Sequence, residues 1–282
     1  MQSVVEVLQK SEAFLAKSGA ETPKIDAEWL LSDCMGIRRL ELFLQHDKPL
    51  EEAVLAEMRK RLKRRASGEP LQYILGHVDF HDVHLAVAPG VLIPRPETEL
   101  LVEKILQRFK DRQAPRIVDL GTGSGAIALA LAKALPEAKV LAVEKSPEAL
   151  KLARANAEAL ELRERVAFRS GNWLEGLDLE ADCIVSNPPY LTEEEWAEAR
   201  REVRDHEPRE ALVASDNGLA DLRQIIDTAV KCLAPGGFLA LEMGIGHGEA
   251  LADYAGAAGY RDCVVENDDT GRGRFLFAWK AK

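Results

Sequence analysis

The tetrapeptide Asn187-Pro188-Pro189-Tyr190 carries the side chains of this chain that are best suited to chemistry. Asn187 offers an amide oxygen and an NH2 group, Pro188 a carbonyl oxygen, and Tyr190 a flat ring with a hydroxyl. Because Pro188 and Pro189 fix φ and donate no backbone hydrogen bond, they hold the turn in one shape. This set suits a planar substrate group that carries an NH2. A proline-rich turn without chemistry is the alternative.

A glycine-rich stretch at residues 117–128 predicts the second part of a site. It reads as an apolar strand, a sharp turn and the start of a helix. Glycines let the backbone of such a turn approach a ligand closely. The spacing also satisfies the relaxed dinucleotide fingerprint, so the turn alone leaves both NAD and S-adenosylmethionine open as cofactors. The residues of the turn are Gly121, Thr122, Gly123, Ser124 and Gly125.

Polar residues beside this turn favour a cationic cofactor without phosphate. Asp119 stands two residues before the first glycine, where a carboxylate disfavours a pyrophosphate but not a cation. Glu144 ends the next expected strand and suits the ribose hydroxyls of either cofactor. Asn172 could form hydrogen bonds with the edge of an adenine. Trp173 could pack on the face of the adenine or, alternatively, in the protein core. An acidic pocket lined by glycine therefore fits S-adenosylmethionine, which carries a sulfonium, better than NAD.

Strand-like and helix-like runs alternate through the last two thirds of the chain. This alternation predicts a doubly wound, mostly parallel α/β sheet of seven strands. Ligands of such sheets bind at the carboxyl ends of the strands, which is where the glycine turn and the tetrapeptide fall. The expected strands are residues 116–120, 139–144, 166–170, 181–186, 237–243, 263–266 and 274–280.

The first 70 residues read as a small helical bundle without a catalytic signature. Ser3 and Glu6 have the spacing of a capping box, and Gly19 and Gly36 are helix stops. Residues 78–87 then alternate with period two, which predicts a β-hairpin. Three histidines fall in or near this strand-like stretch, where a metal site is not expected.

Composition limits the classes of partner. The 282 residues carry a net charge of −10, which disfavours a nucleic-acid backbone as the main partner. The basic run at residues 59–65 is a local exception: it is a solvated helix end, or a docking patch for an acidic partner or RNA. No apolar stretch is long enough for a membrane span, the start lacks the features of a signal peptide, and the four cysteines fit no zinc spacing. We expect a cytoplasmic protein without a metal.

The chain resembles a class I methyltransferase with a Rossmann-like fold, and more narrowly the glutamine methyltransferases of bacterial peptide chain release factors. The resemblance covers nearly the whole length. Residues 93–99 together with residues 187–190 are more specific than either segment alone. The matching stretches are the helical N-terminal part, residues 68–76 (Gly-Glu-Pro-Leu-Gln-Tyr-Ile-Leu-Gly), residues 92–99 (Leu-Ile-Pro-Arg-Pro-Glu-Thr-Glu), residues 121–125 and residues 187–190.

The resemblance implies methylation of the side-chain nitrogen, N5, of the glutamine in the Gly-Gly-Gln motif of class I release factors. It implies S-adenosylmethionine as cofactor and S-adenosylhomocysteine as product. It also implies a helical substrate-recognition domain at residues 1–75, a β-hairpin connector at residues 76–95 and a catalytic domain at residues 96–282. The release factor is the expected partner of a monomeric enzyme, and neither DNA nor a membrane is expected.

Family roles fall on matching positions of this sequence. The glycine turn, Glu144, Trp173 and Asn187 would hold the cofactor, and residues 187–190 would hold the substrate amide. The chain departs from the family where Glu144, Asn172 and Glu97 stand in place of aspartates. The first keeps its carboxylate with a longer reach, whereas the second leaves adenine recognition open.

A mechanism follows from the acceptors of the tetrapeptide. The Asn187 Oδ1 atom and the Pro188 carbonyl would accept the two amide hydrogens of the substrate, while Pro189 and Tyr190 pack around the flat group. No side chain is an obvious general base. Arg95 either pairs with a glutamate at position 97 or 99 or lines the substrate groove.

Several other functions remain open at this point. A ribosomal-protein glutamine methyltransferase fits the tetrapeptide, and so does a nucleic-acid amino-group methyltransferase, although the net charge argues against the latter. An NAD-dependent oxidoreductase fits the glycine turn but leaves Asp119 and residues 187–190 unexplained. A non-catalytic RNA-binding protein would use the basic run.

Overall fold

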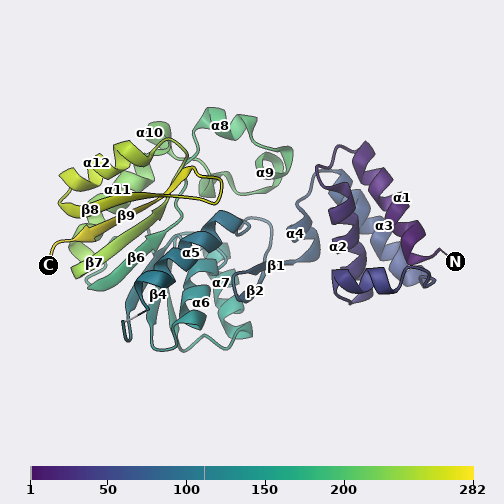
Figure 1. Ribbon diagram of the computed structural model, residues 1–282, viewed down its shortest axis with the longest axis horizontal. Coiled ribbons are helices and arrows are strands. Elements are labelled where there is room, and N and C mark those ends of the chain that lie inside the picture. The colour runs from purple at the N-terminus through teal and green to yellow at the C-terminus, as the bar shows by residue number, and fades with distance from the viewer. Residues whose placement is uncertain (1, 111) are drawn as a thin grey trace. The chain divides into compact units, whose positions relative to one another are not determined.

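The computed structural model describes residues 2–110 and 112–282. It contains two compact units, which are drawn in Figure 1. The helical unit holds the residues up to His77 together with Arg200–His206, and the sheet unit holds Val78–Ala199 and Glu207–Lys282. The chain therefore passes between the two units at three points.

Short helices surround a small apolar core in the helical unit. The predicted capping box of Ser3 and Glu6 is confirmed, and Gly36 ends the second helix in the left-handed region with φ 64°. The short helix after Gly36 is a 3-10 helix, and a five-residue helix after Pro70 was not predicted because it is too short to show a periodic pattern. The elements are α1 (Val4–Lys17), α2 (Pro23–Met35), η1 (Arg39–Leu44), α3 (Glu52–Ala66), α4 (Leu71–Leu75) and α9 (Arg201–His206).

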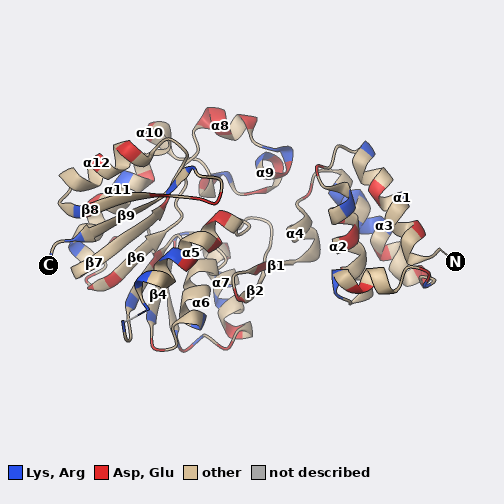
Figure 2. Ribbon diagram, in the orientation of Figure 1, with Lys and Arg blue, Asp and Glu red and all other residues tan. Residues whose placement is uncertain are grey.

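Carboxylates pair with most of the basic run on α3, and Figure 2 shows blue residues on α3 and red residues on α2. Arg65 is nearly buried and pairs with Asp26 and with Glu202 of α9, at 2.7 Å in each case. The other arginine pairs of the run are Arg59 with Glu52, Arg61 with Asp33 and Glu57, and Arg64 with Glu69. The run therefore stabilises the helical unit from within and offers less free positive charge than its sequence indicated.

Seven strands form one sheet in the order β5-β4-β3-β6-β7-β9-β8, and β9 runs antiparallel to both of its neighbours. All seven predicted strands are confirmed. The last three strands begin earlier than predicted, because proline and glycine (β7), polar residues (β8) or glycine (β9) interrupt the apolar pattern near their first positions. The strands are β3 (Arg116–Leu120), β4 (Lys139–Glu144), β5 (Val166–Ser170), β6 (Ala181–Ser186), β7 (Leu233–Glu242), β8 (Tyr260–Asn267) and β9 (Gly273–Lys280).

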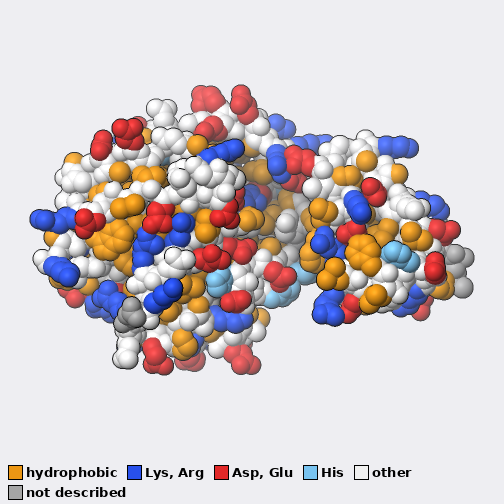
Figure 3. Space-filling model, in the orientation of Figure 1, with side chains coloured by type: hydrophobic (Ala, Val, Ile, Leu, Met, Phe, Trp, Pro, Cys, Tyr) orange, Lys and Arg blue, Asp and Glu red, His pale blue; other side chains and the backbone are white. Residues whose placement is uncertain are grey.

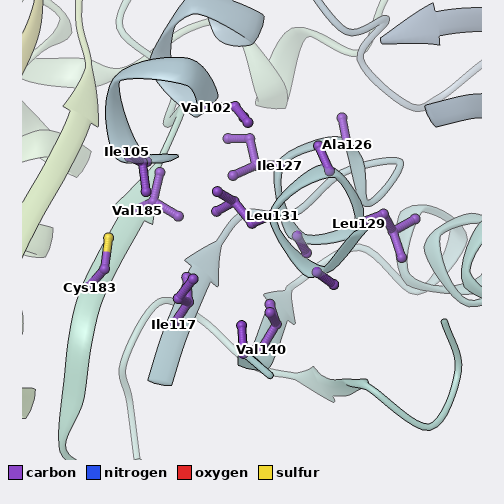
Figure 4. Close-up of a cluster of buried hydrophobic side chains, with 14 of the residues drawn as sticks. Val102, Ile105, Ile117, Ala126, Ile127, Leu129, Leu131, Val140, Cys183 and Val185 are labelled. Atoms are coloured by element: carbon purple, nitrogen blue, oxygen red, sulfur yellow. The ribbon is translucent and has the colours of Figure 1, made fainter. Parts of the chain in front are cut away.

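Helices cover both faces of this sheet. The side chains of β6 alternate between two buried apolar clusters, one on each face of the sheet. Cys183 and Val185 pack into the first cluster and Ile184 into the second. Figure 4 shows side chains of α6 and α5 lying over the strands on the first face. The helices of the first face are α5 (Pro96–Arg108), α6 (Ala126–Ala134) and α7 (Pro147–Ala159), and those of the second are α11 (Ala220–Cys232) and α12 (Gly248–Ala257).

The predicted β-hairpin is present as β1 (His77–Phe80) and β2 (Val83–Ala86). Its apolar residues Phe80, Val83 and Leu85 are buried in the same cluster as α6, so most of the hairpin belongs to the sheet unit. Four short helices between β6 and α11 were not predicted. They are α8 (Glu193–Glu198), α9, η2 (Arg209–Ala211) and α10 (Ser215–Gly218).

No helix in the described part of the chain is long and apolar enough to cross a membrane. Among residues 2–110 and 112–282, no group of three histidine, cysteine, aspartate or glutamate side chains is placed to hold a metal ion. Cys183 and Cys232 are buried free thiols.

Candidate active site

The register of the parallel strands brings the predicted site residues to one edge of the sheet. Leu120 of β3 lies opposite Ser186 of β6, so the glycine turn and the tetrapeptide leave the sheet side by side. The Ser186 hydroxyl donates to the Leu120 carbonyl at 2.7 Å and links the two strand ends. Glu144 lies opposite Ser170 on the far side of β3, so Asn172 and Trp173 emerge at the same edge.

The glycine turn needs its glycines for two different reasons. Gly121, Gly123 and Gly125 all have φ between 58° and 89°, a region that L residues rarely adopt. A Cβ on Gly125 would lie 2.9 Å from Leu129, whereas a Cβ on Gly123 would meet nothing closer than 4.0 Å. Gly123 therefore leaves open space over the turn. Asn156, which is buried, holds the turn by donating from Nδ2 to the Ser124 carbonyl at 2.8 Å.

Asp119 is fully buried beneath the turn. Its Oδ2 atom accepts hydrogen bonds from the Thr122 hydroxyl at 2.5 Å and from the Ala128 N–H at 3.1 Å. Its Oδ1 atom is also buried but has no hydrogen-bond partner among the described residues. Burial raises the pKa of this carboxyl to about 7, against the two hydrogen bonds, which lower it. The residue thus shapes the turn with one oxygen and leaves the other unsatisfied.

Glu144 is half-buried and joins β4 to the turn. Its Oε2 atom accepts from the Gly123 N–H and its Oε1 atom from the Ser146 N–H, both at 2.8 Å. A carboxylate has about four acceptor positions, so two remain for a ligand.

The side chains of Asn172 and Trp173 form hydrogen bonds with different partners. Trp173 has a left-handed φ of 50°, and its ring would lie 3.1 Å from a Cβ placed on Gly121. Its indole N–H donates to Asp221 at 3.2 Å. The ring therefore borders the glycine turn while its inner part packs on the second core cluster. Asn172 instead donates to Glu175 at 2.6 Å.

The tetrapeptide is held by a buried chain of hydrogen bonds. Asn187 donates from Nδ2 to the Thr98 hydroxyl at 3.1 Å, and Thr98 donates to Glu242 Oε2 at 2.7 Å. The Tyr190 hydroxyl donates to the other oxygen of Glu242 at 3.2 Å. Within the described residues, Asn187 Oδ1 accepts no protein hydrogen bond, so it stays available to a ligand. Pro188 is buried and Pro189 is half-buried.

Arg95 does not pair with the glutamate at position 97 or 99, and that expectation is wrong. It pairs with Glu207 at 2.5 Å, because α5 begins at the next residue and carries both nearby glutamates away on the helix. The Glu207 carboxylate is buried and also accepts from the Ile93 N–H at 3.1 Å. Arg95 therefore anchors the segment that returns to the sheet unit after α9.

Two family descriptions match this chain: "PrmC N-terminal domain" over residues 6–76 and "Methyltransferase small domain" over residues 96–203. A release factor glutamine methyltransferase of Geobacter sulfurreducens is 42% identical over 275 residues, which cover 97% of this chain and 95% of that protein. One of Deinococcus radiodurans is 39% identical over 276 residues, which cover 98% of each chain. This chain belongs to the release factor glutamine methyltransferase family.

Solved structures share the predicted fold of this family member. A methyltransferase of Pyrococcus furiosus matches with a TM-score of 0.52 and 20% identity, over 70% of this chain and 89% of that chain. A ribosomal protein L11 methylase of Lactobacillus delbrueckii subsp. bulgaricus matches with a TM-score of 0.51 and 18% identity, over 68% and 82%. The chain is a class I methyltransferase in fold and uses S-adenosylmethionine.

The residues around the turn fit that cofactor. The unsatisfied Asp119 oxygen and the half-buried Glu144 carboxylate favour a ligand that carries positive charge and hydroxyl donors. Residues 119–125 contain no lysine or arginine that would neutralise a phosphate. Gly123 leaves the space that a ligand close to the backbone requires.

Several residues that hold this site were not predicted from the sequence. Thr98 and Glu242 orient the tetrapeptide, Asp221 holds Trp173, and Asn156 holds the glycine turn. One signal was available, because Glu242 is the single charged residue in the apolar run at 237–243. A carboxylate at the end of a buried strand usually has a specific partner.

Proposed function

We propose that this protein transfers a methyl group from S-adenosylmethionine to the side-chain amide nitrogen, N5, of the glutamine in the Gly-Gly-Gln motif of a class I peptide chain release factor. The single observation that carries the proposal is the orientation of Asn187. Its Nδ2 atom is occupied by Thr98 and its Oδ1 atom is unoccupied, at the same sheet edge as the glycine turn. Relatives named release factor glutamine methyltransferase support the choice of substrate.

The chemistry requires help because the lone pair of an amide nitrogen is delocalised into its carbonyl. Asn187 Oδ1 and the Pro188 carbonyl accept the two hydrogens of the substrate NH2, which favours positive charge that develops on nitrogen. S-adenosylmethionine, held by the glycine turn and Glu144, would supply an electrophilic methyl group and would leave as S-adenosylhomocysteine, with the electron pair of the broken carbon–sulfur bond on sulfur. The nitrogen then loses one proton to water. Pro189 and Tyr190 hold the flat amide in line, and such alignment contributes several kcal/mol.

The predicted cofactor contacts extend this proposal. The glycine turn and Glu144 hold the amino acid and ribose parts of the cofactor, with Asp119 facing its positive charge. Trp173 borders the adenosine, and Asn172 serves the adenine edge once it leaves Glu175. Arg95, which pairs with Glu207 and stays partly exposed, is proposed to line the substrate groove.

The helical unit is proposed to bind the release factor away from the reacting glutamine. Five of the seven exposed large apolar side chains in the described residues lie in this unit. They include Leu40 and Leu44 of η1, which are 72% and 86% exposed. Figure 3 shows hydrophobic side chains on the viewed face of the helical unit. We further propose that the enzyme acts as a monomer in the cytoplasm, where release factors work.

The experiment that tests this function offers several acceptors to one enzyme. Purified protein with labelled S-adenosylmethionine is incubated with a class I release factor, ribosomal proteins and DNA in separate reactions. We expect label on the release factor, at the glutamine of its Gly-Gly-Gln motif, by peptide mass mapping. Label confined to ribosomal protein or to DNA would overturn the proposal in favour of the corresponding alternative. Calorimetry with NAD serves as the control for the oxidoreductase class, and we expect no binding.

A further inference from the structure

We propose that Thr98 and Glu242 are positioning residues that fix which end of the Asn187 side-chain amide faces the substrate. Neither residue belongs to the tetrapeptide, and both lie far from it in sequence. The inference rests on the proposed function, because the orientation matters only for a substrate that presents an NH2 group.

Hydrogen bonds link Glu242 to Thr98 and Thr98 to Asn187. The buried carboxylate of Glu242 determines which atom donates and which accepts in each of them. Glu242 is almost fully buried, and its two oxygens face Thr98 and Tyr190. The Thr98 hydroxyl donates its single proton to Glu242 Oε2 at 2.7 Å, and the Tyr190 hydroxyl donates to Oε1, so both oxygens of Glu242 act as acceptors. The Thr98 oxygen then has only lone pairs left for Asn187. It can accept from Nδ2 but cannot donate to Oδ1.

This direction decides the chemistry at Asn187. With Nδ2 bound to Thr98, the acceptor Oδ1 faces the other way and suits a substrate NH2 group. If Thr98 were free to donate to Asn187, the amide could turn by half a rotation at no cost in shape. It would then present its own NH2 to the substrate NH2, and two donors cannot form a hydrogen bond.

The surroundings of Glu242 hold its carboxyl in place and, on balance, raise its pKa. Burial raises the pKa of its carboxyl, while the hydrogen bonds from Thr98 and Tyr190 and the positive charge of Arg274 act in the opposite direction. Arg274 of β9 lies with its guanidinium 5.9 Å from the centre of the Tyr190 ring. The carboxylate of Glu97 on α5 is the other charged group that acts on Glu242.

Four variants separate orientation from packing. T98V keeps the shape of the side chain but removes its oxygen, whereas T98S keeps the hydroxyl. E242Q offers one acceptor in place of two, so Thr98 keeps its direction in only part of the molecules. E266Q is the matched control, because Glu266 of β8 and Glu242 of β7 both lie opposite Phe275 of β9 in the sheet register. Glu266 pairs with Lys104 and Arg108, and neither belongs to the proposed site.

Turnover with release factor is measured for each variant. We expect T98V to lower kcat about 100-fold, the size of effect seen when one oriented group of a polar site is removed. KM and the Kd for S-adenosylmethionine should change less than about threefold. E242Q should lower kcat less than T98V, T98S should stay within about fivefold of wild type, and E266Q should match wild type. A T98S variant as impaired as T98V would overturn the inference.

The decisive comparison uses Asn187→Ala as a background. When no amide remains to be oriented, adding T98V should lower kcat no further, whereas a purely structural role would lower it by the same factor again. A full additional loss in the double variant would therefore overturn the inference.

A measurement without substrate separates this inference from the proposed function. In 15N-labelled wild-type protein, the side-chain amide protons of Asn187 should show a nuclear Overhauser contact to the Thr98 methyl group. Its absence would overturn the inference even if release factor is methylated. Its presence, together with no methylation of release factor, would leave the orientation standing and refute the substrate.

Discussion

Asn187 has one end of its amide bound to the protein and the other end unoccupied, and this asymmetry makes it the centre of the proposed chemistry. The amide lies between the glycine turn and α5, where Thr98 reaches it. Its place at the sheet edge could be predicted from the apolar strand before it and the prolines after it. Its partner could not be predicted, because Thr98 and Glu242 are 144 positions apart and share no periodic pattern.

Asn187→Ala should remove most of the methyl-transfer rate and weaken the binding of S-adenosylmethionine much less. We expect a loss of about 100- to 1,000-fold in kcat, because an acceptor placed for the developing charge is lost. The measurement is single-turnover kinetics with release factor, together with calorimetry for the cofactor. Near wild-type turnover would rule out the proposed role of the side chain.

Asp119 makes a pH-dependent prediction about stability. Its pKa is about 7 in the folded protein and 3.8 for the ordinary carboxyl, so the folded state binds the proton more tightly. The stabilisation from this group is complete below about pH 4 and is lost as the pH rises through about 7. Asp119→Asn cannot ionise. The Tm difference between the variant and wild type should therefore shift in favour of the variant between pH 4 and pH 8.

Melting curves across that range test the prediction, and a pH-independent difference would contradict it. The same carboxyl should make the binding of the cofactor pH-dependent. A cation beside it favours the ionised form, so wild-type affinity for S-adenosylmethionine should rise as the pH increases through about 7. In Asp119→Asn this increase should be reduced.

Strands and long helices could be predicted from the sequence more accurately than short helices could. Four of the seven strands, β3 to β6, have the predicted bounds, because apolar runs between helices determine a parallel sheet. The helices between residues 193 and 218 have three to six residues each, and their shape depends on contacts rather than on periodicity. The backbone N–H groups of Tyr190 and Leu191 both donate to the Leu212 carbonyl. The segment that follows η2 therefore returns to the end of the tetrapeptide.

Gly218 closes this region and should not tolerate a side chain. Its φ is 79°, and a Cβ there would overlap the Tyr190 carbonyl and lie 3.0 Å from His247. Gly218→Ala should destabilise the protein by about 2–3 kcal/mol or displace the tetrapeptide and lower kcat. Gly259→Ala is the control, because Gly259 has φ 99° but open space around it, so it tests the backbone strain alone. Equal losses of stability and activity in the two variants would contradict the proposed overlap.

The exposed residues of η1 make a prediction about recognition. Replacing Leu40 and Leu44 by serine should raise KM for whole release factor about tenfold or more and leave kcat unchanged, because the residues are remote in sequence from the reacting groups. Val264→Ser is the control, since Val264 is an exposed apolar residue of the sheet unit. An unchanged KM in the double variant would place recognition elsewhere.

On the scale of the whole molecule, the sequence predicted a helical part and a sheet part but not how the chain is shared between them. Arg200–His206 comes from the middle of the sheet part in sequence and yet belongs to the helical unit. The reason is ionic: Glu202 pairs with Arg65, and Arg200 pairs with Glu21 at 2.9 Å. No local pattern indicates such a pairing, because its partners are more than 130 residues apart.

Removing residues 1–77 would therefore leave Arg200 and Glu202 without their partners as well as deleting the bundle. We expect that truncated protein to melt at a lower temperature than the full chain, by differential scanning calorimetry. Adding back a separate peptide of residues 1–77 should raise the melting temperature, and this increase should be weaker when Glu202 is replaced by Gln. No response to the peptide would show that the two segments do not associate.

The three crossings between the units also affect how the molecule responds to cleavage. After a single cut following His77, residues 1–77 are held by non-covalent contacts with Arg200–His206, which stay joined to the sheet unit at both ends. After a cut within residues 191–199, each fragment still contributes residues to both units. A nicked enzyme should stay in one piece on a sizing column, and it should divide into two fragments only in denaturant. We therefore expect residues 1–77 and residues 78–282, produced as two separate chains, to associate through Arg200–His206.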